Sequence, residues 1–311
     1  MNQSSLADGH IHFFARRFFR AVLEEAGAGD GVDAALTRMS EDMGFDLPDS
    51  FAEEHARRWL DELDRHSVGR AVFFASLPQE IPDVLTLVGM APDRIAAYSA
   101  LRPNRPDQEP WLDELLNRGV RGFLLFPAAH HYEVDDRRFD PLWNRIEAGA
   151  GILLVHCGIL KFPLQEKLGQ RADYDLRLGN PLAILPLARR FPGIRYVIPH
   201  FGAGFFREAL MVASQCDNVY LDTSSSNVWR RVLPENPSLA EVFARALDVV
   251  GSERILFGTD SSTFPRGWRR DVHAEQVAAL EEIGAGEAEK AAIFHDNLVR
   301  LLDLNAKGPD R

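Results

Sequence analysis

The sequence predicts an α/β protein folded as a (β/α)8 TIM barrel with a long insertion after the first strand. Eight short apolar runs alternate along the chain with longer amphipathic segments. The runs are almost continuously apolar, which is typical of strands buried on both faces of a parallel sheet. The chain has 311 residues, enough for one barrel of about 250 residues with insertions. We therefore expect residues 1–311 to form a single domain.

The predicted strands are rich in β-branched and aromatic residues. They span residues 6–13, 69–75, 94–100, 120–126, 151–156, 194–200, 218–224 and 254–260. The intervening segments repeat apolar residues with a helical period, which predicts helices at 78–91, 109–118, 140–149, 180–191, 203–215, 239–250, 273–283 and 287–303. An open doubly wound sheet uses the same alternation, but the count of eight strands favours the barrel.

Two of the predicted helices carry clear start signals. Asn180 followed by Pro181 combines an N-cap with a proline in the first turn, and Ser238 is a second N-cap candidate. These signals place the beginnings of the helices that follow.

Three connections are longer than the rest. The first, 13–68, carries helical patterns at 14–26 and 50–66 with a polar stretch between them, and the others are 157–179 and 224–237. Long connections at the carboxyl ends of strands form the substrate sites of barrel enzymes. We expect 13–68 and 157–179 to shape the substrate pocket, with an insertion that only packs as the alternative.

Charge and composition exclude several classes of partner. The net charge of −11 argues against a nucleic-acid binder, which needs a basic face. No apolar run approaches the ~20 residues that cross a bilayer, and the N-terminus lacks the regions of a secretory signal. Two cysteines, Cys157 and Cys216, make no disulfide framework. We expect a cytoplasmic protein with a small-molecule substrate and no nucleic-acid or membrane partner; self-association stays open.

Metal-ligand residue types stand at the ends of several predicted strands. The first strand ends in His10-Ile11-His12, the fifth in His156, the sixth in His200 and the eighth in Asp260. Residues i and i+2 of a strand face the same side, so the first two histidines point the same way. The carboxyl ends of barrel strands meet at one rim, where barrel enzymes carry their active sites.

Each of these residues alone has an ordinary structural explanation. A single histidine at a strand end is commonly a packed core residue, and Asp260 could cap a helix. Together, four imidazoles and a carboxylate at one rim need a shared partner, because buried polar groups must be satisfied. Imidazole nitrogen and carboxylate oxygen suit Zn²⁺, and also Mn²⁺, Fe²⁺ or Co²⁺.

Four local sequences around these residues resemble the amidohydrolase superfamily. They are DGHIH, LLVHCG, VIPHFGAG and LFGTDS, and they are similar to the amidohydrolase-related (amidohydrolase 2) branch, which includes aminocarboxymuconate-semialdehyde decarboxylase-like enzymes. The resemblance extends from Asp8 to about Asn297, where IFHDNLVRLL is similar to the usual ending of this branch. It implies a metal-dependent TIM-barrel enzyme.

The resemblance implies a role for each residue. His10, His12 and His156 would bind the metal. Asp260 would ligate the metal or hydrogen-bond its water, and would take the proton of that water. His200 would act as the base or electrophile that orients water or polarises the substrate carbonyl.

The resemblance also bears on the number of metal ions. In binuclear members a strand-four lysine becomes carboxylated and bridges two metals, but the predicted strand 120–126 contains neither lysine nor glutamate. Of the four lysines in the chain, only Lys161 is near a strand end, and it lies in a loop. We therefore expect one divalent transition metal, Zn²⁺, with Mn²⁺ as the alternative.

Four further residues follow strands and are candidates for substrate contact: Arg102, His130, Trp229 and Arg266. An arginine fork binds a carboxylate through two hydrogen bonds, so the arginines favour an anionic substrate. Surface positions are the alternative, because arginine is the usual basic residue of this chain. Cys157 follows a candidate ligand, and we expect it to point away from the metal and pack against a helix.

Hydrolysis is the reaction that this constellation supports most directly. A divalent metal lowers the pKa of bound water to about 7, Asp260 can accept a proton, and His200 can stabilise charge on an attacked carbonyl. We expect a metal-dependent hydrolase of a small carboxylate-bearing amide, lactone or ester. A non-oxidative decarboxylase (carboxy-lyase) is the alternative, because fold and ligands do not separate the two. A non-catalytic metal-binding barrel is disfavoured, since both His200 and Asp260 are present.

Overall fold

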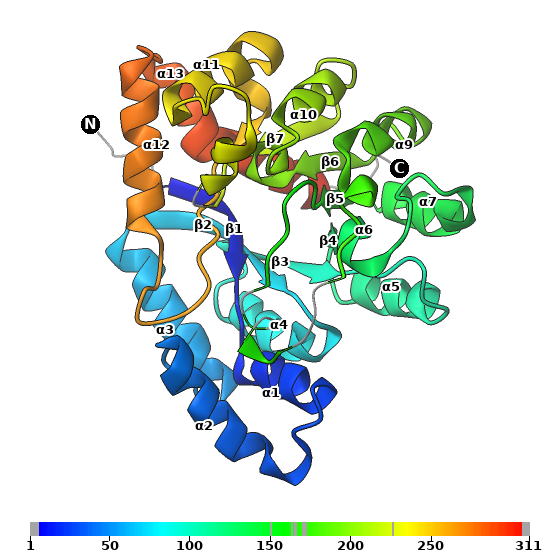
Figure 1. Cartoon of the computed structure of the whole chain (residues 1–311), viewed down its shortest axis with the longest axis vertical. Helices are drawn as coiled ribbons and strands as arrows, with labels where there is room; N and C mark the ends of the chain where they lie inside the picture. Colours follow the sequence, from blue (N-terminus) through cyan, green and yellow to red (C-terminus); the bar gives the residue numbers. More distant parts are fainter. Residues whose placement is uncertain are drawn as a thin grey trace.

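Eight parallel strands form a barrel with helices around its outside (Figure 1). The structure is a computed structural model that describes residues 6–149, 151–162, 164, 167–169, 173–225 and 227–306. The strands are β1 (Leu6–His12), β2 (Val68–Ala75), β3 (Ile95–Ala100), β4 (Gly122–Leu125), β5 (Ile152–Val155), β6 (Arg195–Ile198), β7 (Val219–Asp222) and β8 (Ile255–Leu256). The predicted barrel is therefore confirmed.

Strand order decides between the barrel and the doubly wound sheet. The strands pair in sequential order from β1 to β8, whereas a doubly wound sheet reverses its order part-way. The segment after β8 returns to β1: Ile11 bridges Ser261, and the backbone N–H of Asp260 donates to the carbonyl of His10 at 2.9 Å. These contacts bring the last strand against the first and join the two edges of the sheet.

The helices follow the strands much as the sequence predicts. They are α1 (Arg16–Glu25), α2 (Val32–Met43), α3 (Ala52–Arg65), α4 (Ile81–Met90), α5 (Gln108–Asn117), α6 (Pro127–His130), α7 (Asp140–Ala148), α9 (Ile184–Arg190), α10 (Phe206–Ala213), α11 (Leu239–Val250), α12 (Arg270–Glu282), α13 (Glu287–Ala291) and α14 (Asn297–Ala306). Predicted helix 287–303 is interrupted by a π-helical turn, η9 (Ala292–Asp296). Both predicted N-caps are confirmed: Asn180 accepts from the N–H of Leu182, and Ser238 forms a capping box with Glu241.

The barrel interior is filled by side chains of alternate strand residues, as the two-residue period requires. Among them are Val72, Phe74, Tyr98 and Leu154, and Leu298 of α14 packs into the same cluster. Gly122 of β4 is needed there, because a Cβ at this position would lie 2.1 Å from the Tyr98 ring. The interior is thus a packed core, and polar chemistry is confined to the rim.

The long insertion after β1 contains three helices, α1 to α3, and extends from the barrel at the bottom of Figure 1. Helix α2 lies in the stretch described from the sequence only as polar. Its buried residues are Val32, Leu36, Met39 and Ser40, a narrow apolar stripe that propensity alone does not reveal. This stripe packs against α1 and also against Leu164 of the connection after β5. The two long connections therefore contact each other.

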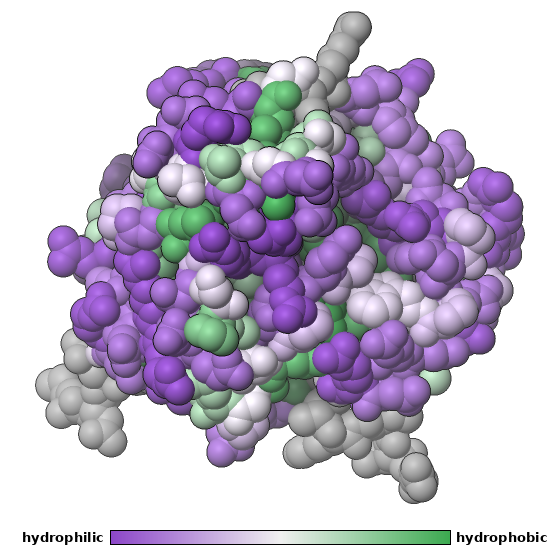
Figure 2. Space-filling view, turned by 90° about the horizontal axis from the view of Figure 1, so that it is seen from below, coloured by the Kyte–Doolittle hydropathy of each residue, from purple (hydrophilic) through white to green (hydrophobic). Residues whose placement is uncertain are grey.

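The surface is predominantly hydrophilic. Figure 2, which looks from the end where the insertion lies, shows hydrophobic residues as small areas among hydrophilic ones. The exposed large hydrophobic residues are spread over several segments of the chain, as Phe51, Met211 and Val232 illustrate. Among the described helices, none combines the length and apolar character needed to cross a membrane.

Candidate metal centre

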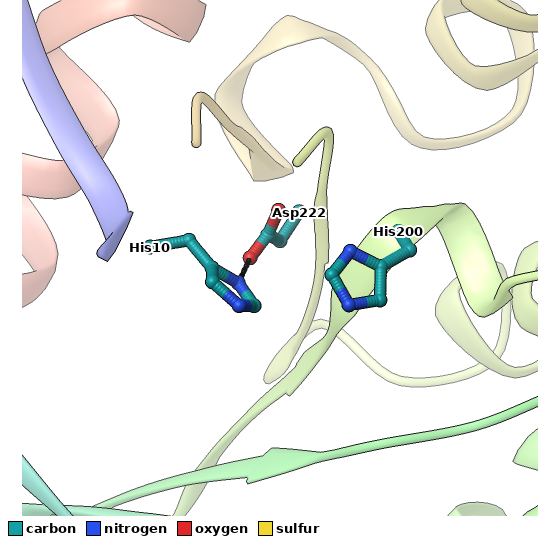
Figure 3. Close-up of side chains that lie close together, drawn as sticks. All are labelled: His10, His200 and Asp222. Carbon is teal, nitrogen blue, oxygen red and sulfur yellow. Dashed lines mark hydrogen bonds and ion pairs between the residues drawn. The ribbon is translucent and has the colours of Figure 1, made fainter. Parts of the chain in front are cut away.

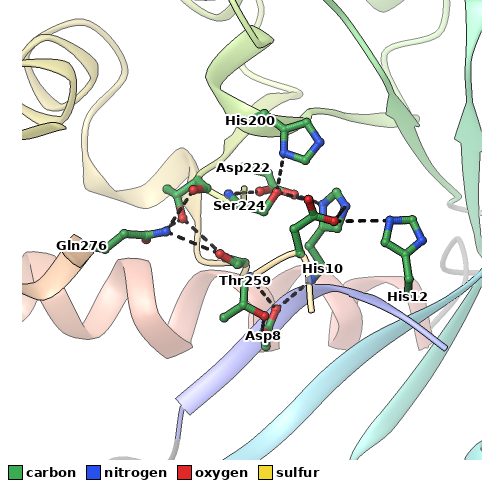
Figure 4. Close-up of polar contacts among 11 residues, drawn as sticks. Asp8, His10, His12, His200, Asp222, Ser224, Thr259 and Gln276 are labelled. Carbon is green, nitrogen blue, oxygen red and sulfur yellow. Dashed lines mark hydrogen bonds and ion pairs between the residues drawn. The ribbon is translucent and has the colours of Figure 1, made fainter. Parts of the chain in front are cut away.

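Strand β1 presents two imidazoles to the same side. Figure 4 shows both imidazoles beside β1. Nε2 of His10 lies 3.7 Å and Nε2 of His12 lies 3.4 Å from Oδ1 of Asp260. Ile11 between them is fully buried in the core outside the barrel. This is the same-face arrangement that the His-x-His spacing predicts. Asp260 comes from the segment that follows β8 and pairs with β1.

The other three candidates lie just beyond their strands, not inside them. Strand β5 ends at Val155, one residue before His156, and β6 ends at Ile198, two residues before His200. His200 and Asp260 have φ angles of +56° and +58°, in the left-handed region that no strand residue adopts. Such backbone costs about 1–3 kcal/mol and clusters at functional sites. The predicted strand ends at 200 and 260 were wrong, because a residue with left-handed backbone angles cannot continue a strand.

The structure brings all five predicted residues together. The ring of His10 lies 5.5 Å from that of His12 and 5.0 Å from that of His200, measured between centroids. The ring of His156 lies 5.3 Å from that of His200. His156 stands next to the cluster, but its nitrogens are not among those that converge on Asp260. Its role as the third imidazole ligand remains a prediction.

Two groups of side chains have ligand atoms close enough to share a metal ion. One is His10, His12 and Asp260, and the other is His10, His200 and Asp222. Ligand atoms about 2.1 Å from a tetrahedral metal lie about 3.4 Å from each other, close to the 3.4 and 3.7 Å separations in the first group. In the second group, Asp222 is already hydrogen-bonded to His10, which leaves the first group as the better metal site.

Asp222 is the residue that sequence reasoning missed. Its Oδ2 accepts a hydrogen bond from Nδ1 of His10 at 2.6 Å, at the end of β7 (Figure 3). A metal-binding histidine commonly donates its second N–H to a carboxylate, which fixes the ring and exposes the other nitrogen. The sequence did contain a signal for this residue: Asp222 is a carboxylate near the end of predicted strand 218–224, and that strand ends at the rim that carries the candidate ligands.

A serine connects two of the imidazoles. Oγ of Ser224 lies 3.0 Å from Nδ1 of His10 and 2.8 Å from Nδ1 of His200. Both Nδ1 atoms are thereby engaged, so Nε2 is the nitrogen of His200 that is left for a substrate or water. In the same way Oγ of Ser76 lies 2.9 Å from Nδ1 of His12. Each of these three histidines thus has its Nδ1 occupied by the protein.

Two buried acids, Asp8 and Glu80, accept hydrogen bonds from the segments that carry the candidate ligands and their serine partner. Asp8 accepts hydrogen bonds from Thr259 and from the indole N–H of Trp268, and so ties β1 to the segment that carries Asp260. Glu80 accepts from the backbone N–H groups of Ala15 and Ser76. Sequence reasoning assigned no role to either acid, since their function depends on contacts between distant segments.

The electrostatics favour a cation at the first group. Burial opposes ionisation of Asp260, but the hydrogen bond with His12 and the charge of His10 keep the pKa of this carboxyl below its ordinary value. Burial alone would lower the pKa of His10, but Asp222 and Asp260 raise it above its ordinary value. Burial lowers the pKa of His12, of His200 and, more strongly, of His156. These three imidazoles are therefore neutral at pH 7, the form that binds metals.

The four substrate candidates occupy different environments. Arg102 and His130 are half-buried at the carboxyl ends of β3 and β4. Arg266 is exposed and donates to Oγ of Ser262 at 2.8 Å. Trp229 is 4% exposed and packs on Phe201 and Phe206 in the outer core, a position that favours packing over substrate contact. Cys157 is buried in the outer core, as predicted.

Half-buried aromatic rings surround the centre. Phe14 stacks on His12 with centroids 4.8 Å apart, and Phe126 stacks on His156 at 5.6 Å. Phe162, in the connection after β5, lies 5.9 Å from Phe126. The insertion and the connection after β5 therefore both place residues beside the site, which supports the predicted contribution of 13–68 and 157–179.

Comparison with known families identifies the superfamily. The amidohydrolase family model matches residues 7–304, nearly the whole chain. The chain belongs to the amidohydrolase family. This amidohydrolase is also 29% identical over 163 residues to the protein fluG of Emericella nidulans, a match that covers 47% of the chain and 18% of fluG. The chain thus corresponds to less than a fifth of that relative.

Solved structures share the fold of this amidohydrolase. A TIM-barrel protein from Bordetella bronchiseptica is 21% identical, with a TM-score of 0.65 and coverage of 97% of this chain and 99% of that chain. A 5-carboxyvanillate decarboxylase from Sphingomonas paucimobilis is 15% identical, with a TM-score of 0.64 and coverage of 96% and 99%. An amidohydrolase from Burkholderia multivorans with bound zinc is 16% identical, with a TM-score of 0.61 and coverage of 96% and 99%. At these identities the likeness shows the fold alone.

Proposed function

We propose that this amidohydrolase is a metal-dependent hydrolase that opens an amide, lactone or ester bond in a small organic substrate. The observation that carries the proposal is the convergence of His10 Nε2, His12 Nε2 and Asp260 Oδ1 at the barrel rim. With His156 as a further imidazole ligand, this donor set suits a single Zn²⁺, and Mn²⁺ is the alternative. A divalent metal held there supplies Lewis acidity and lowers the pKa of water to about 7.

The side chains around that site would perform the remaining steps. Oδ1 of Asp260 faces the two β1 histidines, which leaves Oδ2 to accept a proton from the attacking water. His200, held through Nδ1 by Ser224, would direct Nε2 at the substrate carbonyl and stabilise its developing negative charge. Phe14 and Phe126 would limit the access of water beside the reacting bond.

A metal assay combined with a substrate screen tests the proposal. Purified protein is analysed for transition metals and then assayed against a panel of aromatic acids, lactones and amides, with the His10→Ala variant as the background control. We expect about one Zn²⁺ per chain and ring or amide opening that the variant lacks. Release of CO₂ without ring or amide opening would assign the protein as a carboxy-lyase instead. Two tightly bound metals per chain would overturn the mononuclear site.

A further inference from the structure

The guanidinium of Arg102 lacks the partners that other arginines of this chain have. Among the described residues, every other half-buried arginine has a side-chain hydrogen bond, ion pair or other interaction, as Arg121, Arg190 and Arg254 illustrate. In the same described part of the chain, no carboxylate comes close enough to pair with Arg102. Burial lowers the pKa of this guanidinium, which Glu25 only partly offsets, so the charge is held at a cost in solvation.

The strand geometry directs Arg102 toward the catalytic rim. Tyr98 of β3 points into the barrel, whereas Ala97 and Leu101 lie in the core outside it. The backbone N–H of Leu101 donates to the carbonyl of Leu124 at 3.0 Å, so the ladder with β4 continues past the end of β3. Arg102 has the parity of Tyr98 and therefore faces the axis, at the end where the candidate metal ligands lie.

His130 provides a second unsatisfied group on the neighbouring loop. Its Nδ1 is buried without a hydrogen-bond partner. Burial, followed by the charge of Arg102 and by His131, lowers the pKa of His130 to about 3, so the ring is neutral. Asn104 donates to the backbone carbonyl of His130 at 2.7 Å and joins the two loops. A buried nitrogen without a partner is unfavourable unless a ligand or water bonds to it.

A row of rings connects His130 to the candidate metal site. The His130 ring lies 6.0 Å from Phe126, and Phe126 stacks on His156 at 5.6 Å. His130 is thus one aromatic side chain away from a predicted ligand. A small molecule whose reacting bond lies at the metal could reach them with a group at its other end.

We propose that Arg102 and His130 form a carboxylate-binding subsite, so that the substrate is an organic acid whose carboxylate is held on the β3–β4 side of the rim. This inference rests on the proposed function and narrows its substrate class. Arg102 supplies the planar fork that a carboxylate accepts from, and neutral His130 supplies one N–H donor. The carboxylate restores the missing partners of both groups.

Ligand binding to metal-free protein tests the subsite without relying on turnover. Protein stripped with a chelator is titrated with benzoate and glutarate and, in parallel, with their uncharged amides, benzamide and glutaramide. The titration is repeated on Arg102→Gln, Arg102→Lys and the control Arg105→Gln, which alters an exposed arginine on the same loop. We expect wild type and Arg105→Gln to bind at least one acid more tightly than its amide.

The two Arg102 variants separate charge from geometry. Arg102→Gln should weaken acid binding at least ~10-fold, the usual value of a charge-assisted hydrogen bond. The acid affinity of Arg102→Lys should lie between those of wild type and Arg102→Gln, since lysine keeps the charge but loses the planar fork of the guanidinium. Equal acid binding by wild type and Arg102→Gln, or no preference of wild type for either acid over its amide, would overturn the subsite. Because no metal or turnover is involved, this result is independent of whether the hydrolase assignment holds.

Discussion

Asp222 accepts a hydrogen bond from Nδ1 of His10 at 2.6 Å, and this contact sets which nitrogen of His10 faces Asp260. Burial opposes ionisation of Asp222, but His10 outweighs burial and lowers the pKa of the carboxyl. Asp222 is therefore charged and keeps the proton of His10 on Nδ1. Nε2 is therefore the nitrogen of His10 that faces Asp260, whose Oδ1 lies 3.7 Å away.

Replacing Asp222 by asparagine should weaken metal binding without removing a ligand. The amide oxygen can still accept from His10, but the negative charge that makes the imidazole a stronger donor is lost. The expected loss is about 10–100-fold in metal affinity, as for other carboxylates behind a ligating histidine. Competition with a chromophoric zinc chelator measures it. The control Asp136→Asn changes a surface carboxylate paired with Arg138 and should leave the affinity unchanged. Equal affinities in both variants would mean that Asp222 only packs.

Alanine at His10 or His12 should abolish stoichiometric metal binding while the barrel stays folded. Both rings are at the rim, so the interior cluster of Phe74, Tyr98 and Leu154 is retained. Elemental analysis measures the metal content of each variant, and circular dichroism reports whether it is folded. His295→Ala is the control, because the His295 ring pairs with Asp296 in the π-helical turn η9, which precedes α14. His156→Ala belongs in the same series, because its ring lies outside the converging group. Full metal content in any variant would remove that residue from the ligand set.

The elements that were predicted correctly are those encoded by local pattern. Continuous apolar runs located all eight strands, and the two-residue period placed His10 and His12 on one face. What the pattern could not show depends on distant contacts. Asp222 became visible only when β7 lay beside β1, and the left-handed backbone at His200 and Asp260 moved both residues beyond their strands.

Gly258 illustrates the same limit. In the sequence it is one glycine within LFGTDS. In the structure a Cβ there would lie 2.7 Å from Cβ of His10 and 3.2 Å from Oδ1 of Asp222. A side chain would displace the pair that orients the candidate ligand. Only the packed structure reveals that close approach, since the φ of this residue needs no glycine.

Glu80 should make stability depend on pH. Burial raises its pKa to about 8, although the N–H groups of Ser76, Ala15 and Leu77 oppose this shift. The folded-state pKa exceeds the ordinary value of 4.5, so the folded protein binds the proton more tightly than the unfolded chain does. The contribution of Glu80 is fully present below about pH 4.5 and is lost as the pH rises toward 8.

Glu80→Gln removes this titration. The variant should be less stable than wild type at pH 5, because its amide NH₂ faces a backbone donor, an unfavourable contact of about 1–3 kcal/mol. The difference should shrink as the pH approaches 8. Melting temperatures of the metal-free proteins between pH 5 and 8 measure it, and Glu24→Gln, an exposed change in α1, is the control. If the difference in melting temperature between wild type and Glu80→Gln is the same at every pH from 5 to 8, Glu80 does not titrate in this range.

Replacing His200 by asparagine should separate catalysis from metal binding. His200 contacts the protein through Nδ1 and Ser224, and its Nε2 is absent from the group of His10, His12 and Asp260 atoms that fits a metal. Asparagine removes Nε2 as an acid, base or electrophile but leaves that group intact. Metal content should stay near wild type, and kcat per bound metal should fall by ~10²–10⁴, the usual contribution of a positioned acid–base group.

Ser224→Ala should give a smaller decrease in kcat per bound metal, because the His200 ring stays in place but loses the contact that orients it. Turnover per bound metal on a substrate from the screen is the readout for both variants. If His200→Asn loses its metal together with its activity, then His200 is a ligand, and if turnover per metal is unchanged, it has no part in the reaction.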